Sequence, residues 1–164
     1  TVFKFGVERF CKDAKDAVAY GLIVPDMPID EEGEEHFIAN CRKYNLHNIQ
    51  VISPASNEER LKKNAEVSSG FIYCTAHQGI TGAKKQLDPE IVSYLRRVKK
   101  FFSVPIAVGF GISKKEHIEK LASLADIAVV GSAIIDVIGK SNSKSLENNI
   151  VNFLKQLKYA NIQA

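Results

Sequence analysis

The sequence predicts an α/β fold built on a parallel β-sheet. Five short runs are interpreted as continuous, mainly apolar stretches: 21–24, 48–53, 70–75, 104–109 and 126–131. Such runs are typical of strands that are buried on both faces, as in parallel sheets. Each run is followed by a segment with helical spacing of apolar residues, and repeated βα units predict right-handed crossovers within one sheet.

The helices are predicted from the spacing of apolar residues. Before the first strand, one helical face carries Val7, Phe10, Cys11, Ala14 and Val18. A second helix is expected over 34–44, and helices also follow the next three strands. The last helix is expected to bury Leu146, Ile150, Phe153, Leu154 and Leu157.

Three sequence signals predict where helices begin. Ser56-x-x-Glu59 and Ser113-x-x-Glu116 have the pattern of capping boxes, in which a hydroxyl accepts a helix N–H. Asp88-Pro89 supplies an N-cap residue and a proline in the first turn.

The composition indicates one soluble domain over residues 1–164, with 45% hydrophobic residues and a net charge of +3. This charge gives no reason to expect nucleic acid or an anionic membrane as partner, and RRVKK (96–100) is expected to form a solvated helix face. Cys11, Cys41 and Cys74 lack CxxC spacing, which favours buried thiols in a cytoplasmic protein. The histidines show no metal-ligand spacing, so no metal site is expected.

Glycine-rich loops follow the last three strands: GITGA (79–83), GFGIS (109–113) and GSAII (131–135). Glycine lets backbone N–H groups approach an anion, and Gly131-Ser132 precedes a short apolar helix over 133–138. These loops predict one phosphate site at the carboxyl ends of the strands. Two architectures fit this pattern: an open doubly wound sheet and part of a (β/α)8 barrel.

The chain resembles the tryptophan synthase alpha family. The resemblance rests on VPDMPIDE (24–31), ISPAS (52–56), GFIYCTAHQGITGAK (70–84), VGFGIS (108–113) and VVGSAII (129–135), in the family's order and spacing. It implies strands four to eight of a (β/α)8 TIM barrel. It also implies cleavage of indole-3-glycerol phosphate to indole and glyceraldehyde 3-phosphate without a cofactor. Pyridoxal phosphate is expected only in a partner, the tryptophan synthase beta subunit.

The resemblance also implies roles for particular residues. The substrate phosphate would be bound by Gly82, Gly111, Gly131 and Ser132. Tyr73 would face the substrate as an auxiliary catalytic candidate, and Thr81 would lie in a loop that closes over the site. The indole pocket would be lined by Ile23, Pro25, Ile52, Phe110 and Val129. The loop 25–32 would dock on the beta subunit.

The sequence departs from the family pattern in two ways. His77 stands where the family usually has Arg, and the family's catalytic Glu and Asp have no counterpart. Asp26 is the only acid expected near the carboxyl end of a strand, whereas Asp126 opens one. We therefore expect about 80–100 further residues upstream, at roughly 30 per βα unit, with three strands and both acids.

Two alternative functions remain open from the sequence. One is a non-catalytic phosphate-binding partner that activates a beta subunit, which the missing acids favour. The other is a different phosphate-binding barrel, such as a phosphoribosyl isomerase, which would need an Asp at a strand end in this half of the barrel.

Overall fold

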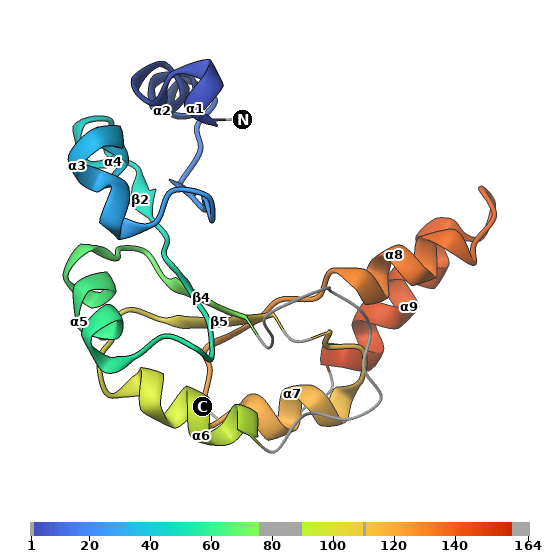
Figure 1. The fold of residues 1–164 in the computed structure, drawn as a ribbon. Coiled ribbons are helices and arrows are strands. Elements are labelled where there is room, and N and C mark those ends of the chain that lie inside the picture. The colour runs from blue at the N-terminus through green and yellow to red at the C-terminus, as the bar shows by residue number, and fades with distance from the viewer. Residues whose placement is uncertain (1, 76–89, 110, 159–164) are drawn as a thin grey trace.

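The computed structural model describes residues 2–75, 90–109 and 111–158. Its strands form two parallel sheets in sequence order, as consecutive βα units require (Figure 1). The first sheet pairs β1 (Gly21–Leu22) with β2 (His47–Asn48), and the second contains β3 (Val51–Ile52), β4 (Ile72–Thr75), β5 (Ile106–Gly109) and β6 (Ile127–Ala128). All five predicted apolar runs contain strand, but the strands are shorter than the runs.

The predicted single strand over 48–53 is wrong, because this run forms the two strands β2 and β3. The chain changes partner within it: β2 pairs with β1, and β3 pairs with β4. The two intervening residues keep the ladder connected. Ile49 donates its N–H to the Leu22 carbonyl (3.0 Å), and the Gln50 carbonyl accepts from the Tyr73 N–H (2.9 Å). The run therefore still joins its neighbours on both sides.

The helices alternate with the strands along the chain. In order they are α1 (Val2–Phe5), α2 (Val7–Asp16), the 3-10 turn η1 (Ile29–Glu31), α3 (Glu32–Glu35), α4 (Phe37–Lys43), α5 (Glu58–Val67), α6 (Glu90–Lys99), α7 (Lys115–Leu121), α8 (Ser132–Gly139) and α9 (Leu146–Lys158). Among them, none is long and apolar enough to cross a membrane.

The single helix predicted over 34–44 is also wrong, because His36 breaks it. His36 adopts a left-handed conformation with φ of 52°, which ends α3 and precedes α4. Glu32 explains the restart of the helix. Its two carboxylate oxygens accept the N–H groups of Ile38 (2.7 Å) and Ala39 (2.8 Å), so they cap the first turn of α4.

Both predicted capping boxes are wrong. Helix α5 is capped by Asn57, whose side chain accepts from the Arg60 N–H at 2.8 Å. The Ser56 hydroxyl accepts instead from the Ser53 N–H at 3.3 Å, which closes the turn before the helix. The Asn side chain caps as well as serine does, so the start shifts by one residue.

At α7, Lys114 precedes the helix and no side chain caps it. Ser113 donates its N–H to Nδ1 of buried His117 at 3.4 Å. The Asp88-Pro89 start lies outside the described residues.

The core lies on one side of the larger sheet. Helices α5, α6 and α7 cover the same face (Figure 1). The strands contribute Ile52, Ile72, Cys74, Ile106 and Val108 to this core, and the helices contribute Leu61, Ile91, Leu95, Val98 and Leu121. On the opposite face Ile127 is 40% exposed. A barrel places its helices outside and its other sheet face inside, whereas a doubly wound sheet is covered on both faces.

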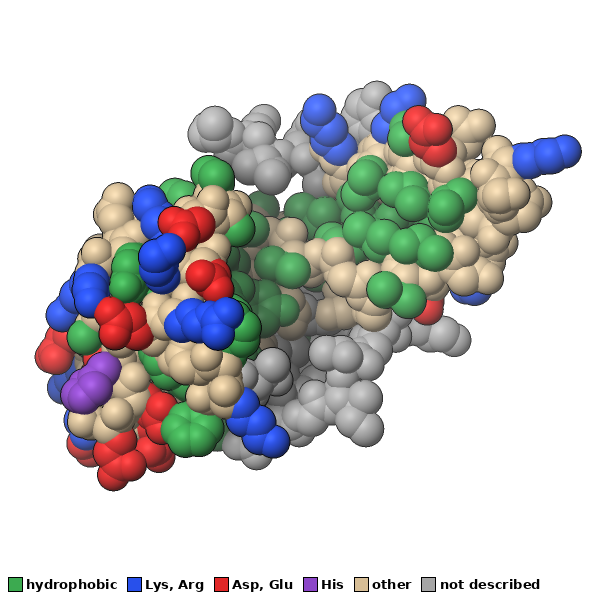
Figure 2. Space-filling model, turned by 90° about the horizontal axis from the view of Figure 1, so that it is seen from above, with side chains coloured by type: hydrophobic (Ala, Val, Ile, Leu, Met, Phe, Trp, Pro, Cys, Tyr) green, Lys and Arg blue, Asp and Glu red, His purple; other side chains and the backbone are tan. Residues whose placement is uncertain are grey.

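A second apolar surface lies on α8 and α9. Figure 2 shows hydrophobic side chains gathered over these helices, and Ile135, Ile138, Val151 and Leu154 are exposed. Of the residues expected to be buried in the last helix, only Leu157 is buried. The helical spacing was predicted correctly, but no described element covers the rest of this face. We call Ile135, Ile138, Val151 and Leu154 the α8–α9 face.

The predicted burial of all three cysteines is confirmed, and none forms a disulfide. Burial raises the pKa of Cys41 to about 12 and that of Cys74 to about 11. Unfolded thiols ionise at lower pH, so the thiols contribute to stability below about pH 9 and oppose folding progressively as the pH rises toward those values.

We expect the free energy of unfolding to fall above pH 9. In urea titrations the fall should be smaller in a Cys41→Ala, Cys74→Ala variant; an identical pH profile would contradict this assignment.

Candidate functional site

The site predicted from the sequence lies at the carboxyl ends of β4, β5 and β6. In the sheet, Tyr73 aligns with Ala107 on β5, and Ala107 aligns with Ile127 on β6. Aligned residues of parallel strands point to the same face, and neighbouring residues alternate. Because Cys74 points into the helix-side core, Tyr73 projects from the opposite face, which would be the inner face of a barrel.

The Tyr73 side chain reaches toward the strand ends and lies over Gly109. A Cβ atom placed on Gly109 would stand 2.0 Å from the Tyr73 hydroxyl oxygen and 2.7 Å from Cζ of its ring. Neither approach is sterically possible, so the tyrosine occupies the space that a side chain would need. Gly109 therefore serves close packing, and it keeps the Tyr73 hydroxyl at the carboxyl end of β5.

We expect Gly109→Ala to destabilise the protein by about 1–3 kcal/mol, the usual cost of overpacking. The cause is local, so much of the loss should disappear in a Tyr73→Leu background, where the ring is removed. A double-mutant cycle by urea unfolding measures this coupling. If both backgrounds lost equal stability, the contact between Tyr73 and Gly109 would not be the reason for the glycine.

The loop after β5 is held by its neighbours. Gly111 has a φ of 64°, a backbone conformation that side chains rarely adopt. The next residue, Ile112, is buried in the core, and Ser113 is held by His117 of α7. Gly111 therefore stands on a loop that is anchored on its carboxyl side, beyond the strand that Tyr73 covers.

The third glycine motif forms the start of α8, as predicted. Gly131 is the residue before the helix, and its carbonyl accepts from the N–H groups of Ile134 (2.9 Å) and Ile135 (3.2 Å). The N–H groups of Ser132 and Ala133 donate to no other described residue. A Cβ on Gly131 would meet nothing within 4 Å. Free amides at a helix N-terminus with open space before them can hold an anion.

The residues predicted to line an indole pocket are not gathered in one place by the described chain. Ile23 and Pro25 are exposed beyond β1, and Val129 follows β6 and donates its N–H to the Val108 carbonyl at 2.8 Å. Ile52 is fully buried in the helix-side core, away from the face that carries Tyr73. Its position does not favour direct contact with a ligand on that face. Gly82, Thr81, Phe110 and His77 lie outside the described residues.

Sequence reasoning missed two side chains that hold the end of β3. The Tyr94 hydroxyl donates to the Ile52 carbonyl at 2.9 Å, and Nη2 of Arg97 donates to the Pro54 carbonyl at 2.6 Å. Both come from α6. Apolar spacing could not identify them, because a buried tyrosine and a half-buried arginine fit the same helical face as ordinary core residues. Burial raises the pKa of Tyr94, so its hydroxyl stays a proton donor at every physiological pH.

The loop predicted to dock on a partner is also fixed by a polar contact. Arg60 of α5 forms an ion pair with Asp30 at 2.9 Å, on the 3-10 turn of that loop. A cavity of about 50 Å³ lies beneath it, lined partly by Met27, Gln50 and Asn64. This volume has room for one or two water molecules rather than a substrate.

The described acids do not converge on the strand ends. Asp126 lies at the amino end of β6, where its carboxylate accepts the Ile106 N–H at 2.8 Å, as the sequence predicted. Asp26 is exposed in the loop after β1. Across residues 2–75, 90–109 and 111–158, no group of His, Cys, Asp or Glu side chains could hold a metal ion.

A parallel sheet covered by helices on one face, with glycine-containing loops at the carboxyl ends of its strands, is the arrangement of the (β/α) barrel class. The model of the family "Tryptophan synthase alpha chain" matches residues 1–162. The chain belongs to this family. The predicted fold class, with this chain supplying part of a (β/α)8 barrel, is confirmed by the structural similarities described next.

The relatives agree in both sequence and structure. The tryptophan synthase alpha chain of Methanocaldococcus jannaschii is 45% identical over 139 residues, which are 85% of this chain and 49% of the relative. That of Caldicellulosiruptor saccharolyticus is 42% identical over 158 residues, 96% of this chain and 59% of the relative. A Mycobacterium tuberculosis tryptophan synthase structure matches with a TM-score of 0.83 at 29% identity, over 99% of this chain and 60% of that one.

A Pyrococcus furiosus tryptophan synthase complex gives a TM-score of 0.81 at 28% identity, over 96% of this chain and 61% of that chain. The chain thus spans about half to three fifths of the length of these relatives.

Proposed function

We propose that this chain is the substrate-holding part of a tryptophan synthase alpha protein that cleaves indole-3-glycerol phosphate to indole and glyceraldehyde 3-phosphate. The observation that carries this proposal is the Tyr73 hydroxyl over Gly109, next along the sheet to the open amides of Ser132 and Ala133. The amides suit the phosphate, and the tyrosine offers an aromatic wall and one hydroxyl to the rest of the substrate. Family membership supports the identity of that substrate.

Within this proposal the chain binds and orients, and it uses no cofactor of its own. Retro-aldol cleavage moves protons between carbon and oxygen, which positioned acids and bases can do without a metal or an organic cofactor. Gly111 and Gly131 would bring backbone N–H groups to the phosphate, and Ser132 would add its hydroxyl. The cleavage reaction would take place in the cytoplasm.

The partner in this proposal is a tryptophan synthase beta subunit, which would bind at the loop 25–32. The ion pair between Asp30 and Arg60 and the cap formed by Glu32 connect this loop to α5 and α4. A preformed surface loses less conformational entropy on association. We expect this chain to co-elute with a beta subunit. Pro28→Asp on this loop should weaken the co-elution, whereas Lys144→Asp on the segment between α8 and α9 should not.

The direct test of the proposal is calorimetry with a stable substrate analogue, indole-propanol phosphate. We expect saturable binding of the analogue, and we expect glycerol 3-phosphate to displace it, since both compounds share the phosphate.

A related non-catalytic role, binding phosphate to activate a beta subunit, is favoured by the positions of Asp26 and Asp126 away from a common site. Binding without indole release, even in a longer protein that carries the family's acids, would favour that second role. No binding of either compound would contradict both.

A further inference from the structure

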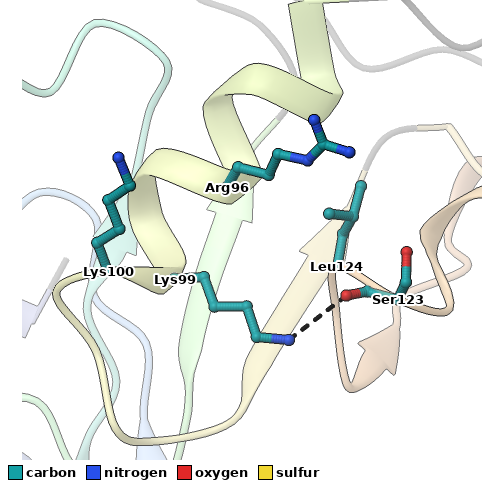
Figure 3. A pocket seen from close by; sticks show the side chains of 5 residues that line it. All are labelled: Arg96, Lys99, Lys100, Ser123 and Leu124. Atoms are coloured by element: carbon teal, nitrogen blue, oxygen red, sulfur yellow. Dashed lines mark hydrogen bonds between the residues drawn. The ribbon is translucent and has the colours of Figure 1, made fainter.

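A basic hollow lies at the opposite end of the sheet from the candidate site. It has a volume of about 390 Å³ and is lined by Arg96, Lys99, Lys100, Ser123 and Leu124 (Figure 3). Arg96 and Lys99 come from the end of α6, Lys100 follows it directly, and the last two come from the turn between α7 and β6. Both segments lead into the amino ends of strands, whereas the glycine loops follow carboxyl ends. The hollow is therefore separate from the proposed substrate site.

The positive charge of the chain is concentrated beside this hollow. Residues 96–100 carry four cationic side chains and no acid, one charge more than the net +3 of the whole chain, so all other residues together have a net charge of −1. Four cationic side chains within five residues make this a locally basic segment. A local excess of this kind marks a surface that attracts anions.

The cations are not neutralised within the described chain. None of its ion pairs involves Arg96, Lys99 or Lys100. Arg96 and Lys99 are three residues apart, which places them on neighbouring positions of the α6 surface, where like charges repel. The helix dipole favours cations in a last turn, but it does not require two cations that repel one another. The nearby Asp126 carboxylate is already engaged with the Ile106 N–H.

Donors from both segments face the same hollow. Figure 3 shows Arg96 and Lys99 directed toward the turn at Ser123 and Leu124, with Lys100 on the other side of the helix end. Lys99 Nζ donates to the Ser123 carbonyl at 3.4 Å, which holds the ammonium group at the rim. The Ser123 hydroxyl makes no hydrogen bond to another described residue. Leu124, buried in the core, fixes the turn.

We propose that this hollow binds a small phosphate-bearing anion, held by the Arg96 guanidinium, the Lys99 ammonium and the Ser123 hydroxyl. A planar guanidinium binds two phosphate oxygens at once, and an ammonium group and a hydroxyl supply further donors from other directions. The hollow is open and shallow, so it suits the phosphate end of a ligand and leaves the remainder in solvent. Pyrophosphate, which has several charged oxygens and no other groups, is the probe that isolates this chemistry.

The test is calorimetric titration, with pyrophosphate at low ionic strength, of the 164-residue chain carrying Gly131→Asp. This substitution blocks the proposed substrate phosphate site, so binding at the basic hollow is measured by itself. We expect saturable binding of about one equivalent that is weakened at least about tenfold in an Arg96→Gln, Lys99→Gln variant, as expected for losing two charge-assisted hydrogen bonds.

A matched control removes the same two charge types elsewhere. Arg42 and Lys62 are exposed and lie on α4 and α5, so Arg42→Gln, Lys62→Gln lowers the net charge equally without touching the hollow. It should bind pyrophosphate nearly as the parent does. Absence of saturable pyrophosphate binding would overturn the proposal. Equal weakening in both double variants would also overturn it, because it would show general attraction of the anion to positive charge instead of a site. The result does not depend on whether the substrate proposal holds, because every variant in this series carries Gly131→Asp.

Discussion

Gly131→Asp is expected to abolish binding of glycerol 3-phosphate and indole-propanol phosphate while the fold is retained. A Cβ at this position meets nothing within 4 Å, so the substituted side chain has room. An aspartate before a helix accepts the first amides with its own carboxylate. It would therefore occupy the N–H groups of Ser132 and Ala133 and repel a phosphate at the same time. Calorimetry measures the loss of binding, and urea unfolding should show unchanged or higher stability.

Two control variants separate the loss of the phosphate site from a general effect of the added negative charge. Gly131→Ala adds a methyl group in open space without a carboxylate and should keep most of the affinity. Gly139→Asp places the same charge at the other end of α8, also in open space, and should leave phosphate binding nearly unchanged. Unaltered affinity in Gly131→Asp would remove the start of α8 from the phosphate site.

The sequence predicted the features that repeat or that depend on a run of apolar residues. The mainly apolar runs identified every strand region. The expected burial on both faces is not seen in the described chain, where helices cover one face of the larger sheet and both residues of β6 are exposed. A short helix over 133–138 was predicted from a glycine followed by an apolar turn, and α8 begins one residue earlier, at Ser132. These signals are local, so neighbouring residues alone decide them.

The features that the sequence could not predict depend on contacts between distant residues. Glu32 caps α4 from six and seven residues away, and Tyr94 reaches a carbonyl 42 residues before it. The reason for a glycine at 109 became visible only when Tyr73 was placed above it, since glycine by itself is equally consistent with a turn. The burial of α9 was overestimated for a related reason: apolar spacing shows which face needs a cover, but not whether the described chain supplies one.

We expect the 164-residue chain by itself to release no measurable indole from indole-3-glycerol phosphate. Cleavage requires a proton delivered to the indole ring and another removed from the glycerol hydroxyl. Among the described residues, Asp26 is exposed after β1 and Asp126 faces the amino end of the sheet, so neither stands beside Tyr73 or Ser132. Each missing acid or base costs roughly 10²–10⁴-fold in rate, and two missing groups bring the rate to background.

Activity should appear when the chain is joined to the portion of the Methanocaldococcus jannaschii alpha chain that precedes the matched region. That relative is about twice as long as the segment it shares with this chain, and strands added before β1 would cover the inner face around Ile127 and approach the edge of β6. The α8–α9 face should become protected from hydrogen exchange in the same chimera. Indole release is measured by its absorbance or fluorescence, and the chimera carrying Gly131→Asp serves as the inactive control. A mass-verified 164-residue chain that released indole at the rate of the chimera would show that its own residues hold the missing acid and base.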